Sequence, residues 1–138
     1  MTISRFNHEG YPDPTAFAAF TNIEAELRKA RFRPVVYVCS PYSGDTDVNI
    51  LNARRYCRFA VDSGYIPIAP HLLFPQFMRE DDERDLALFM DIVLLTKCAE
   101  LWAFGDTITK GMELEITRAR RRDQPIRYFT NDCQEVVI

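Results

Sequence analysis

Apolar and polar positions alternate along the chain in blocks that predict helices and strands in turn. A first helix is expected from Asp13-Pro14, a typical N-cap and N1 pair, to about residue 30. Its apolar residues recur at helical spacing and are Phe17, Phe20, Ile23, Leu27 and Ala30. Residues 1–11 are polar and irregular, so we expect a loose arm there. Residues 1–34 are therefore interpreted as an N-terminal addition that packs on the following domain or on a partner subunit.

Short apolar blocks in residues 35–138 predict the strands of a parallel sheet. Residues 35–39 are apolar throughout, which is typical of a strand buried on both faces. The next blocks are residues 66–69, 101–104 and 126–129, and residues 136–138 are a candidate for a short fifth strand. Pro67 lacks a backbone N–H, which favours an edge position for the second strand.

Helical patterns separate these strands. One covers about residues 47–63, and a second runs from the acidic segment at residues 80–83 to about residue 98. A third follows the 101–104 block and places Met112, Ile116 and Ala119 on its core side. Residues 70–78 are expected to form an apolar loop. This alternation predicts an α/β domain with a flavodoxin-like (Rossmann-like) three-layer sandwich and a 4–5-stranded parallel sheet in the order 2-1-3-4(-5).

The predicted order places two loops at one end of the sheet. The chain changes direction between the first and third strands, and ligands of open parallel sheets bind outside the carboxyl ends at such a point. The loops expected there are residues 40–45 and 105–111. The sequence contains neither G-x-G-x-x-G nor G-x-x-x-x-G-K-[ST], so a dinucleotide fold and a nucleotide triphosphatase are not indicated.

Composition excludes several classes of partner and cofactor. The formal net charge is −3, so a broad basic surface for a nucleic-acid polymer is not expected. Two histidines and four cysteines without a C-x-x-C pair make a structural zinc site improbable, and we expect no metal or cofactor. Three cysteines fall in apolar patterns, which indicates reduced thiols and a cytoplasmic location. No apolar run approaches the length of a membrane span.

Two carboxylates are candidates for chemistry. Glu115 lies at the edge of its helix's core face and near the helix N-terminus, which makes it a candidate nucleophile or general base, whereas Glu113 lies well off that face. A capping or salt-bridging role for Glu115 stays open. Asp91 lies within a strongly apolar helix and needs a partner or a function there. If both carboxylates share a site, we expect Glu115 to stay ionised and Asp91 to titrate higher.

Several of these segments together resemble the nucleoside 2-deoxyribosyltransferase superfamily, in particular its small uncharacterised bacterial and phage branch. The matching segments are residues 37–44, 67–71 and 111–119, together with Asp91, and the resemblance spans about residues 35–129. It implies a nucleoside 2-deoxyribosyltransferase-like domain in which a glutamate attacks the anomeric carbon of a nucleoside or nucleotide. Glu115 matches that nucleophile and Asp91 the assisting carboxylate.

The resemblance and the predicted loops also give a set of substrate-binding residues. They are Tyr37, Ser40, Pro41, Tyr42, Ser43, Gly44, His71, Gly105, Gly111 and Met112. Relatives that bind a 5′-phosphate carry an arginine in the first loop, where this chain has Ser43, so nucleoside and 5′-monophosphate both remain open. Relatives also often have the glutamate directly after Gly-Met, and Glu113 has that spacing, so it stays an alternative nucleophile.

The expected function is cleavage or transfer of an N-glycosidic bond through a glutamate glycosyl-enzyme, by a homodimer or larger homo-oligomer. Hydrolase and transferase differ only in the acceptor, and the sequence does not separate them. A non-catalytic nucleotide-binding or sensor protein on the same fold is the alternative. A third hypothesis is an assembly module that uses the N-terminal helix and the loop with Phe74 and Phe77 as its interface.

Overall fold

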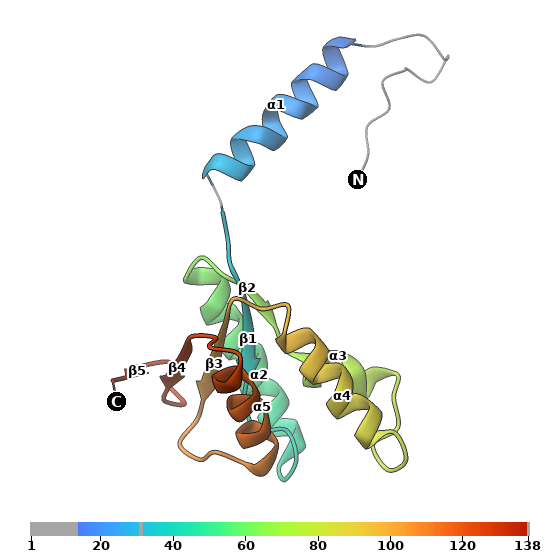
Figure 1. Ribbon diagram of the computed structural model, residues 1–138, viewed down its shortest axis with the longest axis vertical. Helices are drawn as coiled ribbons and strands as arrows, with labels where there is room; N and C mark the ends of the chain where they lie inside the picture. Colours follow the sequence, from blue (N-terminus) through green and yellow to red (C-terminus); the bar gives the residue numbers. More distant parts are fainter. Residues whose placement is uncertain (1–13, 31, 138) are drawn as a thin grey trace. The chain divides into compact units, whose positions relative to one another are not determined.

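The computed structural model describes residues 14–30 and 32–137, and the chain divides into two units, Met1–Phe32 and Arg33–Ile138. In the first unit, α1 (Pro14–Ala30) confirms the predicted N-terminal helix (Figure 1). Its predicted N-cap and the predicted loose arm lie outside the described residues. Packing of this helix on the domain or on a partner subunit stays a prediction.

The second unit is built around a five-stranded sheet in the order β2-β1-β3-β4-β5. The strands are β1 (Val35–Cys39), β2 (Ile66–Ile68), β3 (Glu100–Phe104), β4 (Ile126–Phe129) and β5 (Glu135–Val136). The first four pair in parallel, which confirms the predicted order and the edge position of the Pro67 strand. β5 is antiparallel to β4, so the sheet is not parallel throughout. The turn between them is too short for the crossover that a parallel strand needs.

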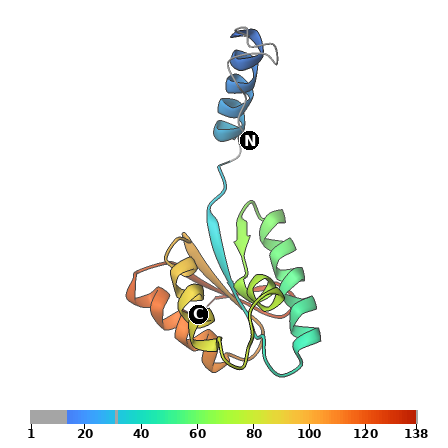
Figure 2. The ribbon, with the colours of Figure 1, turned by 90° about the vertical axis from the view of Figure 1, so that its right-hand side faces the viewer.

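Helices cover both faces of the sheet and complete the predicted three layers. Figure 2 shows α2 (Thr46–Asp62) on one face, with α4 (Arg84–Leu95) and α5 (Lys110–Arg121) on the other. The core accordingly forms two clusters. Tyr37 and Cys39 pack with α4 and α5, whereas Val36 and Val38 pack with α2. This alternation along β1 decides which of its side chains can reach α5.

The segment between β2 and α4 differs from the prediction. The expected apolar loop contains a short helix, α3 (Pro70–Leu73), followed by the 3-10 turn η1 (Phe74–Gln76). The helix expected from residue 80 begins only at Arg84. The acidic side chains before it bind Arg79 instead: Glu83 accepts from its backbone N–H at 2.7 Å, and Asp82 pairs with its guanidinium at 2.8 Å. These contacts hold the segment as a turn.

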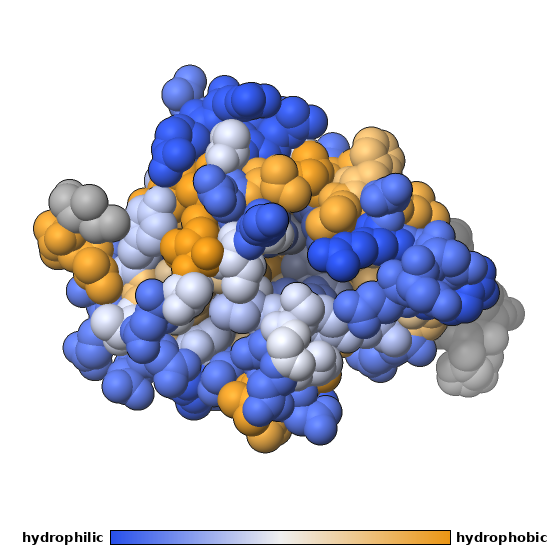
Figure 3. All heavy atoms as spheres, turned by 90° about the horizontal axis from the view of Figure 1, so that it is seen from below, coloured by the Kyte–Doolittle hydropathy of each residue, from blue (hydrophilic) through white to orange (hydrophobic). Residues whose placement is uncertain are grey.

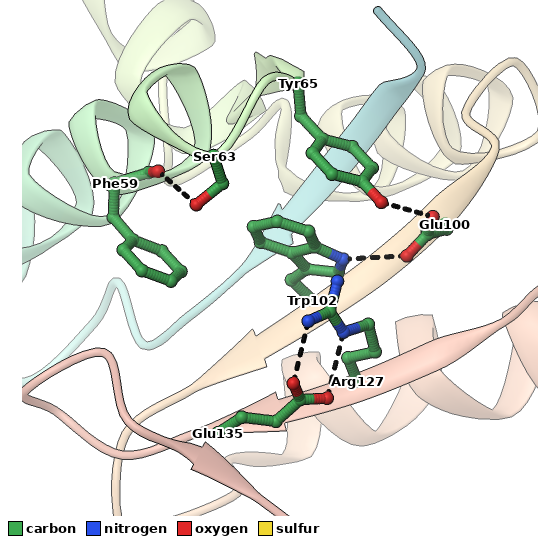
Figure 4. Close-up of polar contacts among 7 residues, drawn as sticks. All are labelled: Phe59, Ser63, Tyr65, Glu100, Trp102, Arg127 and Glu135. Carbon is green, nitrogen blue, oxygen red and sulfur yellow. Dashed lines mark hydrogen bonds and ion pairs between the residues drawn. The ribbon is translucent and has the colours of Figure 1, made fainter.

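A polar cluster on the α2 face ties the last three strands together (Figure 4). The Trp102 indole N–H and the Tyr65 hydroxyl both donate to the Glu100 carboxylate, each at 3.0 Å. The Arg127 guanidinium lies 4.8 Å from the Trp102 ring centre and forms two bonds with Glu135. The short β5 is therefore fixed to β4 by a side-chain pair as well as by its backbone.

The structure also bears on the state of the cysteines and on membrane-spanning helices. The four cysteines are free, with Cys39 and Cys98 buried in the core. Within the described residues, no helix has both the length and the apolar character needed to cross a membrane.

Candidate active site

A cavity of about 460 Å³ opens at the carboxyl end of the sheet, where the sequence predicts a site. The first turns of α2, α4 and α5 lie at this lower end of the domain in Figure 1. Figure 3 views this end and shows hydrophilic and apolar side chains intermingled around it. The cavity is lined by the loop after β1, by the α3–η1 segment and by one face each of α4 and α5. Of the predicted site residues, those lining it are Ser40, Tyr42, Ser43, His71, Asp91, Gly111, Met112 and Glu115.

Glu115 enters the cavity from the second turn of α5. The helix starts at Thr109, whose hydroxyl accepts a bond from the Met112 N–H at 3.2 Å. The Tyr37 hydroxyl donates a hydrogen bond to Glu115 Oε2, and the Cys39 thiol lies 3.6 Å from Oε1. Both partners come from the α5 side of β1. Tyr37 is thus a buried support for Glu115 rather than a residue of the cavity wall, where the sequence placed it among the substrate-binding residues.

Burial sets the protonation of the two carboxyl groups. It raises the pKa of Glu115 to about 7; the hydrogen bond from Tyr37 lowers this pKa, the charge of Asp91 raises it and the Cys39 thiol lowers it. Burial also raises the pKa of Asp91 to about 7. The sequence predicted that Glu115 would titrate below Asp91. The two values are alike because desolvation outweighs the bonds that favour the ionised form of Glu115.

Asp91 lies on a regular face of α4 that lines the cavity. The lining residues of this helix are Arg84, Ala87, Leu88 and Asp91, at positions i, i+3, i+4 and i+7. Arg84 is exposed and Asp91 is partly buried, so this face runs from the solvent-exposed opening of the cavity toward its interior. At 1.5 Å per residue, the two Cα atoms are about 10 Å apart along the helix.

His71 connects the first loop to the α3 segment. Its Nε2 lies 3.0 Å from the Ser40 hydroxyl, and its ring centre lies 6.0 Å from that of Tyr42. Burial lowers the pKa of His71 to about 4, so the imidazole is neutral at physiological pH. Asn49 donates to the backbone carbonyls of Tyr42 and Ser43, both at 3.1 Å, and so holds this loop against α2.

Besides Tyr37, three of the predicted binding residues do not line the cavity: Pro41, Gly44 and Gly105. Gly44 and Gly105 have φ angles of 97° and 105°, a region that favours glycine, so both serve the turns that carry the site. A Cβ at Gly105 would lie 3.9 Å from the Pro41 ring. Pro41 and Gly105 thus bring the two loops close together without lining the cavity.

Glu113, the alternative nucleophile, is separated from this cavity. It is exposed and borders a different groove on α5, together with Leu114 and Arg118. Two residues along a helix turn the side chain by about 200°, which explains the separation from Glu115.

The cationic part of the site was not predicted from the sequence. Arg79, Arg84 and Lys110 all line the cavity, as does Thr109. The available signal was the seven-residue spacing from Arg84 to Asp91, which places both on one helical face once the helix start is known. Across the described ranges, no group of three or more His, Cys, Asp or Glu side chains is arranged to hold a metal ion.

Comparison with known proteins adds a family but no activity. No curated protein matches the chain. One family model, described as a domain of unknown function (DUF7768), matches residues 34–129, which include both cavity carboxylates and every strand except β5. The chain therefore belongs to the DUF7768 family.

Proposed function

We propose that the protein cleaves or transfers the N-glycosidic bond of a nucleoside or nucleotide through a glycosyl-enzyme on Glu115. The observation that supports this most is the convergence of two carboxyl groups with raised pKa values on one cavity at the switch point of the sheet. The resemblance to nucleoside 2-deoxyribosyltransferases supports the same chemistry. DUF7768 membership itself carries no activity.

The proposed first step forms a covalent sugar ester. A Glu115 carboxylate oxygen attacks the anomeric carbon while the carbon–nitrogen bond to the base breaks, and the base leaves with a proton from Asp91. In the second step Asp91 takes a proton from water, which attacks the same carbon and releases Glu115. A second base in place of water gives transfer instead of hydrolysis. Both steps invert the anomeric carbon, so the net result is retention.

The surroundings of the two carboxyl groups support these separate roles. With both pKa values near 7, the pair binds about one proton at neutral pH. Tyr37 and Cys39 donate to Glu115, and a hydrogen bond to a carboxylate favours its ionised form. Asp91 has no hydrogen bond to another described residue. Because the two pKa values are alike, the singly protonated pair includes the form with the proton on Asp91, and that form provides an ionised nucleophile and a neutral acid.

Release of free base from a panel of nucleosides and nucleoside 5′-monophosphates tests the proposal. In Glu115→Gln we expect kcat to fall by a factor on the order of 10³ or more, because the covalent intermediate is lost. Asp91→Asn should cost roughly 10²–10⁴-fold, as for a single acid–base group. Glu113→Gln is the matched control, since it changes the same residue type on the same helix outside the cavity, and it should retain wild-type turnover.

A trapped intermediate provides the second readout. A 2-fluoro-arabinosyl nucleoside slows the breakdown of the sugar ester, so intact-mass spectrometry should detect an adduct that maps to the peptide with Glu115. If Glu115→Gln retains full activity, the glycosyl-enzyme mechanism is wrong. If the wild-type protein binds these ligands and releases no base from any of them, the protein is a nucleotide-binding module instead.

A further inference from the structure

The opening of the Glu115 cavity carries a group of cations that the proposed chemistry does not use. Arg79, Arg84 and Lys110 line the cavity and are exposed, whereas Glu115 and Asp91 are partly buried. The three cations come from three separate segments: the turn after η1, the first turn of α4 and the first turn of α5. Helix-surface charges usually point into solvent, so convergence of three on one cavity is a feature that a ligand can explain.

Two of these cations are available to a ligand. Within residues 14–30 and 32–137, no hydrogen bond or ion pair involves the side chain of Arg84 or Lys110, whereas Arg79 pairs with Asp82 at 2.8 Å. Glu80 is the acidic residue among the exposed lining groups. With Arg79 neutralised by Asp82, the two positive charges of Arg84 and Lys110 against the one negative charge of Glu80 leave a net positive opening on a chain whose formal net charge is −3. Such a local inversion of charge favours an anionic ligand.

The first turn of α5 adds backbone hydrogen-bond donors that an anionic ligand could use. The Thr109 hydroxyl accepts from the Met112 N–H, and the Thr109 carbonyl accepts from the Glu113 N–H. The N–H groups of Lys110 and Gly111, both cavity residues, have no acceptor among the described residues. The positive end of the helix dipole therefore lies beside the Lys110 ammonium group.

The geometry points to a phosphate subsite: we propose that Arg84 and Lys110, with Arg79, bind the 5′-phosphate of a nucleoside monophosphate whose anomeric carbon lies at Glu115. Arg84 lies about 10 Å from Asp91 along α4, and Lys110 lies about 8 Å from Glu115 along α5, at 1.5 Å per residue. Because these side chains line the same cavity, a phosphate held at its opening can be joined to an anomeric carbon at Glu115 through part of the sugar ring and the 5′ carbon. This inference rests on the proposed function, and it narrows the substrate class from nucleosides and nucleotides to 5′-monophosphates.

The first loop contributes no cation to the cavity, since its lining residues are Ser40, Tyr42 and Ser43. The cations come instead from the turn after η1 and from the first turns of α4 and α5. An arginine presents paired donors to phosphate oxygens, and a lysine adds a point charge.

Ligand affinities measured on Glu115→Gln test the subsite without turnover. Calorimetry would compare 2′-deoxynucleoside 5′-monophosphates with the matching 2′-deoxynucleosides, and ribose 5-phosphate with inorganic phosphate. We expect the monophosphate to bind about 10–100-fold tighter than the nucleoside, since a hydrogen bond to a charged group accounts for that range. Adding Arg84→Gln and Lys110→Gln should remove this preference and leave nucleoside affinity unchanged.

Matched controls use exposed cations outside the cavity. Arg54→Gln on α2 and Lys97→Gln after α4 alter net charge equally and should retain the preference. Equal affinity for monophosphate and nucleoside, or an unchanged preference in the Arg84 and Lys110 variant, would refute the subsite. Binding of inorganic phosphate with no preference for the nucleotide would also refute it. Release of base from nucleosides alone would support the proposed function and refute the phosphate subsite. A preference for monophosphates without any release of base would support the subsite and refute the proposed function.

Discussion

At Glu115, two opposing effects act on one carboxyl group. Removal from water raises its pKa, and the Tyr37 and Cys39 donors beneath it oppose that rise. The result is a group that is ionised for much of the time at neutral pH while remaining poorly hydrated, which is a favourable state for a nucleophile. The same burial raises the pKa values of the Tyr37 hydroxyl and the Cys39 thiol, so both stay protonated and able to donate.

Removal of the Tyr37 hydroxyl should therefore be visible in the pH profile. Tyr37→Phe takes away a bond that favours ionised Glu115, so the pKa of Glu115 rises. We expect the ascending limb of kcat/KM to move to higher pH by about one unit, the equivalent of 1.36 kcal/mol. Cys39→Ala should move it in the same direction and by less, because a thiol is a weak donor.

Tyr65→Phe is the matched control for that experiment. Tyr65 also donates to a carboxylate, Glu100, but it lies with the α2 face of the sheet, away from the cavity. Removal of the Tyr65 hydroxyl should leave the pH profile of kcat/KM unchanged. An unmoved profile in Tyr37→Phe would show that the hydroxyl does not act on the ionisation of Glu115.

The raised pKa of Asp91 predicts how the stability of the fold depends on pH. Its pKa is about 7 in the folded protein and 3.8 ordinarily, so the folded state binds its proton more tightly than the unfolded chain does. The stability that Asp91 contributes is present below about pH 4 and is lost as pH rises through 7. Asn carries no charge at any pH. We therefore expect Asp91→Asn to raise Tm over wild type at pH 8 by on the order of 5 °C, and to leave Tm nearly unchanged at pH 4.

Thermal melts at the two pH values measure this difference. Asp85→Asn on the exposed side of the same helix is the control and should give no such gain at pH 8. A Tm gain of equal size at both pH values would contradict the assignment to a buried charge.

At the scale of elements, periodicity predicted the regular helices and strands and failed between them. The buried β1 and the amphipathic α5 follow strong patterns, and their bounds agree with the prediction to within a few residues. The helix start predicted at residue 80 was wrong because the acidic side chains of residues 80–83 bind the local backbone and Arg79 rather than starting a helix. Side-chain contacts of this kind compete with helix formation and leave no periodic signal. The helix α3 within residues 70–78 was missed because its four residues are too few for a periodic signal.

The first turn of α5 offers a test at this scale. Thr109→Ala removes the hydroxyl that accepts from the Met112 N–H. We expect the free energy of unfolding to fall by about 1 kcal/mol, the usual effect of losing an N-cap. Chemical denaturation measures the change, and Thr109→Ser, which keeps the hydroxyl, should restore most of it. Equal stability of the Ala and Ser variants would contradict the capping role.

For the whole domain, the sequence predicted the strand order and the end of the sheet where the cavity lies. Both follow from alternation and from the handedness of crossovers. Glu115 and Asp91 were identifiable because a carboxylate on or near an apolar face is conspicuous. Arg79, Arg84 and Lys110 were not, because an exposed cation has the same pattern whether it faces solvent or a cavity. Only the packing of three separate segments brings these cations together.

Both edges of the sheet are protected against further strands. β2 has three residues and carries Pro67, which offers no N–H, and β5 has two residues and is bonded through the Arg127–Glu135 pair. Short edges with proline or charge resist edge-to-edge pairing between copies of a chain. Two consequences follow. The sheet is a poor template for fibrils, and if copies of this domain associate, the geometry favours contacts through helices rather than a sheet that continues across the interface.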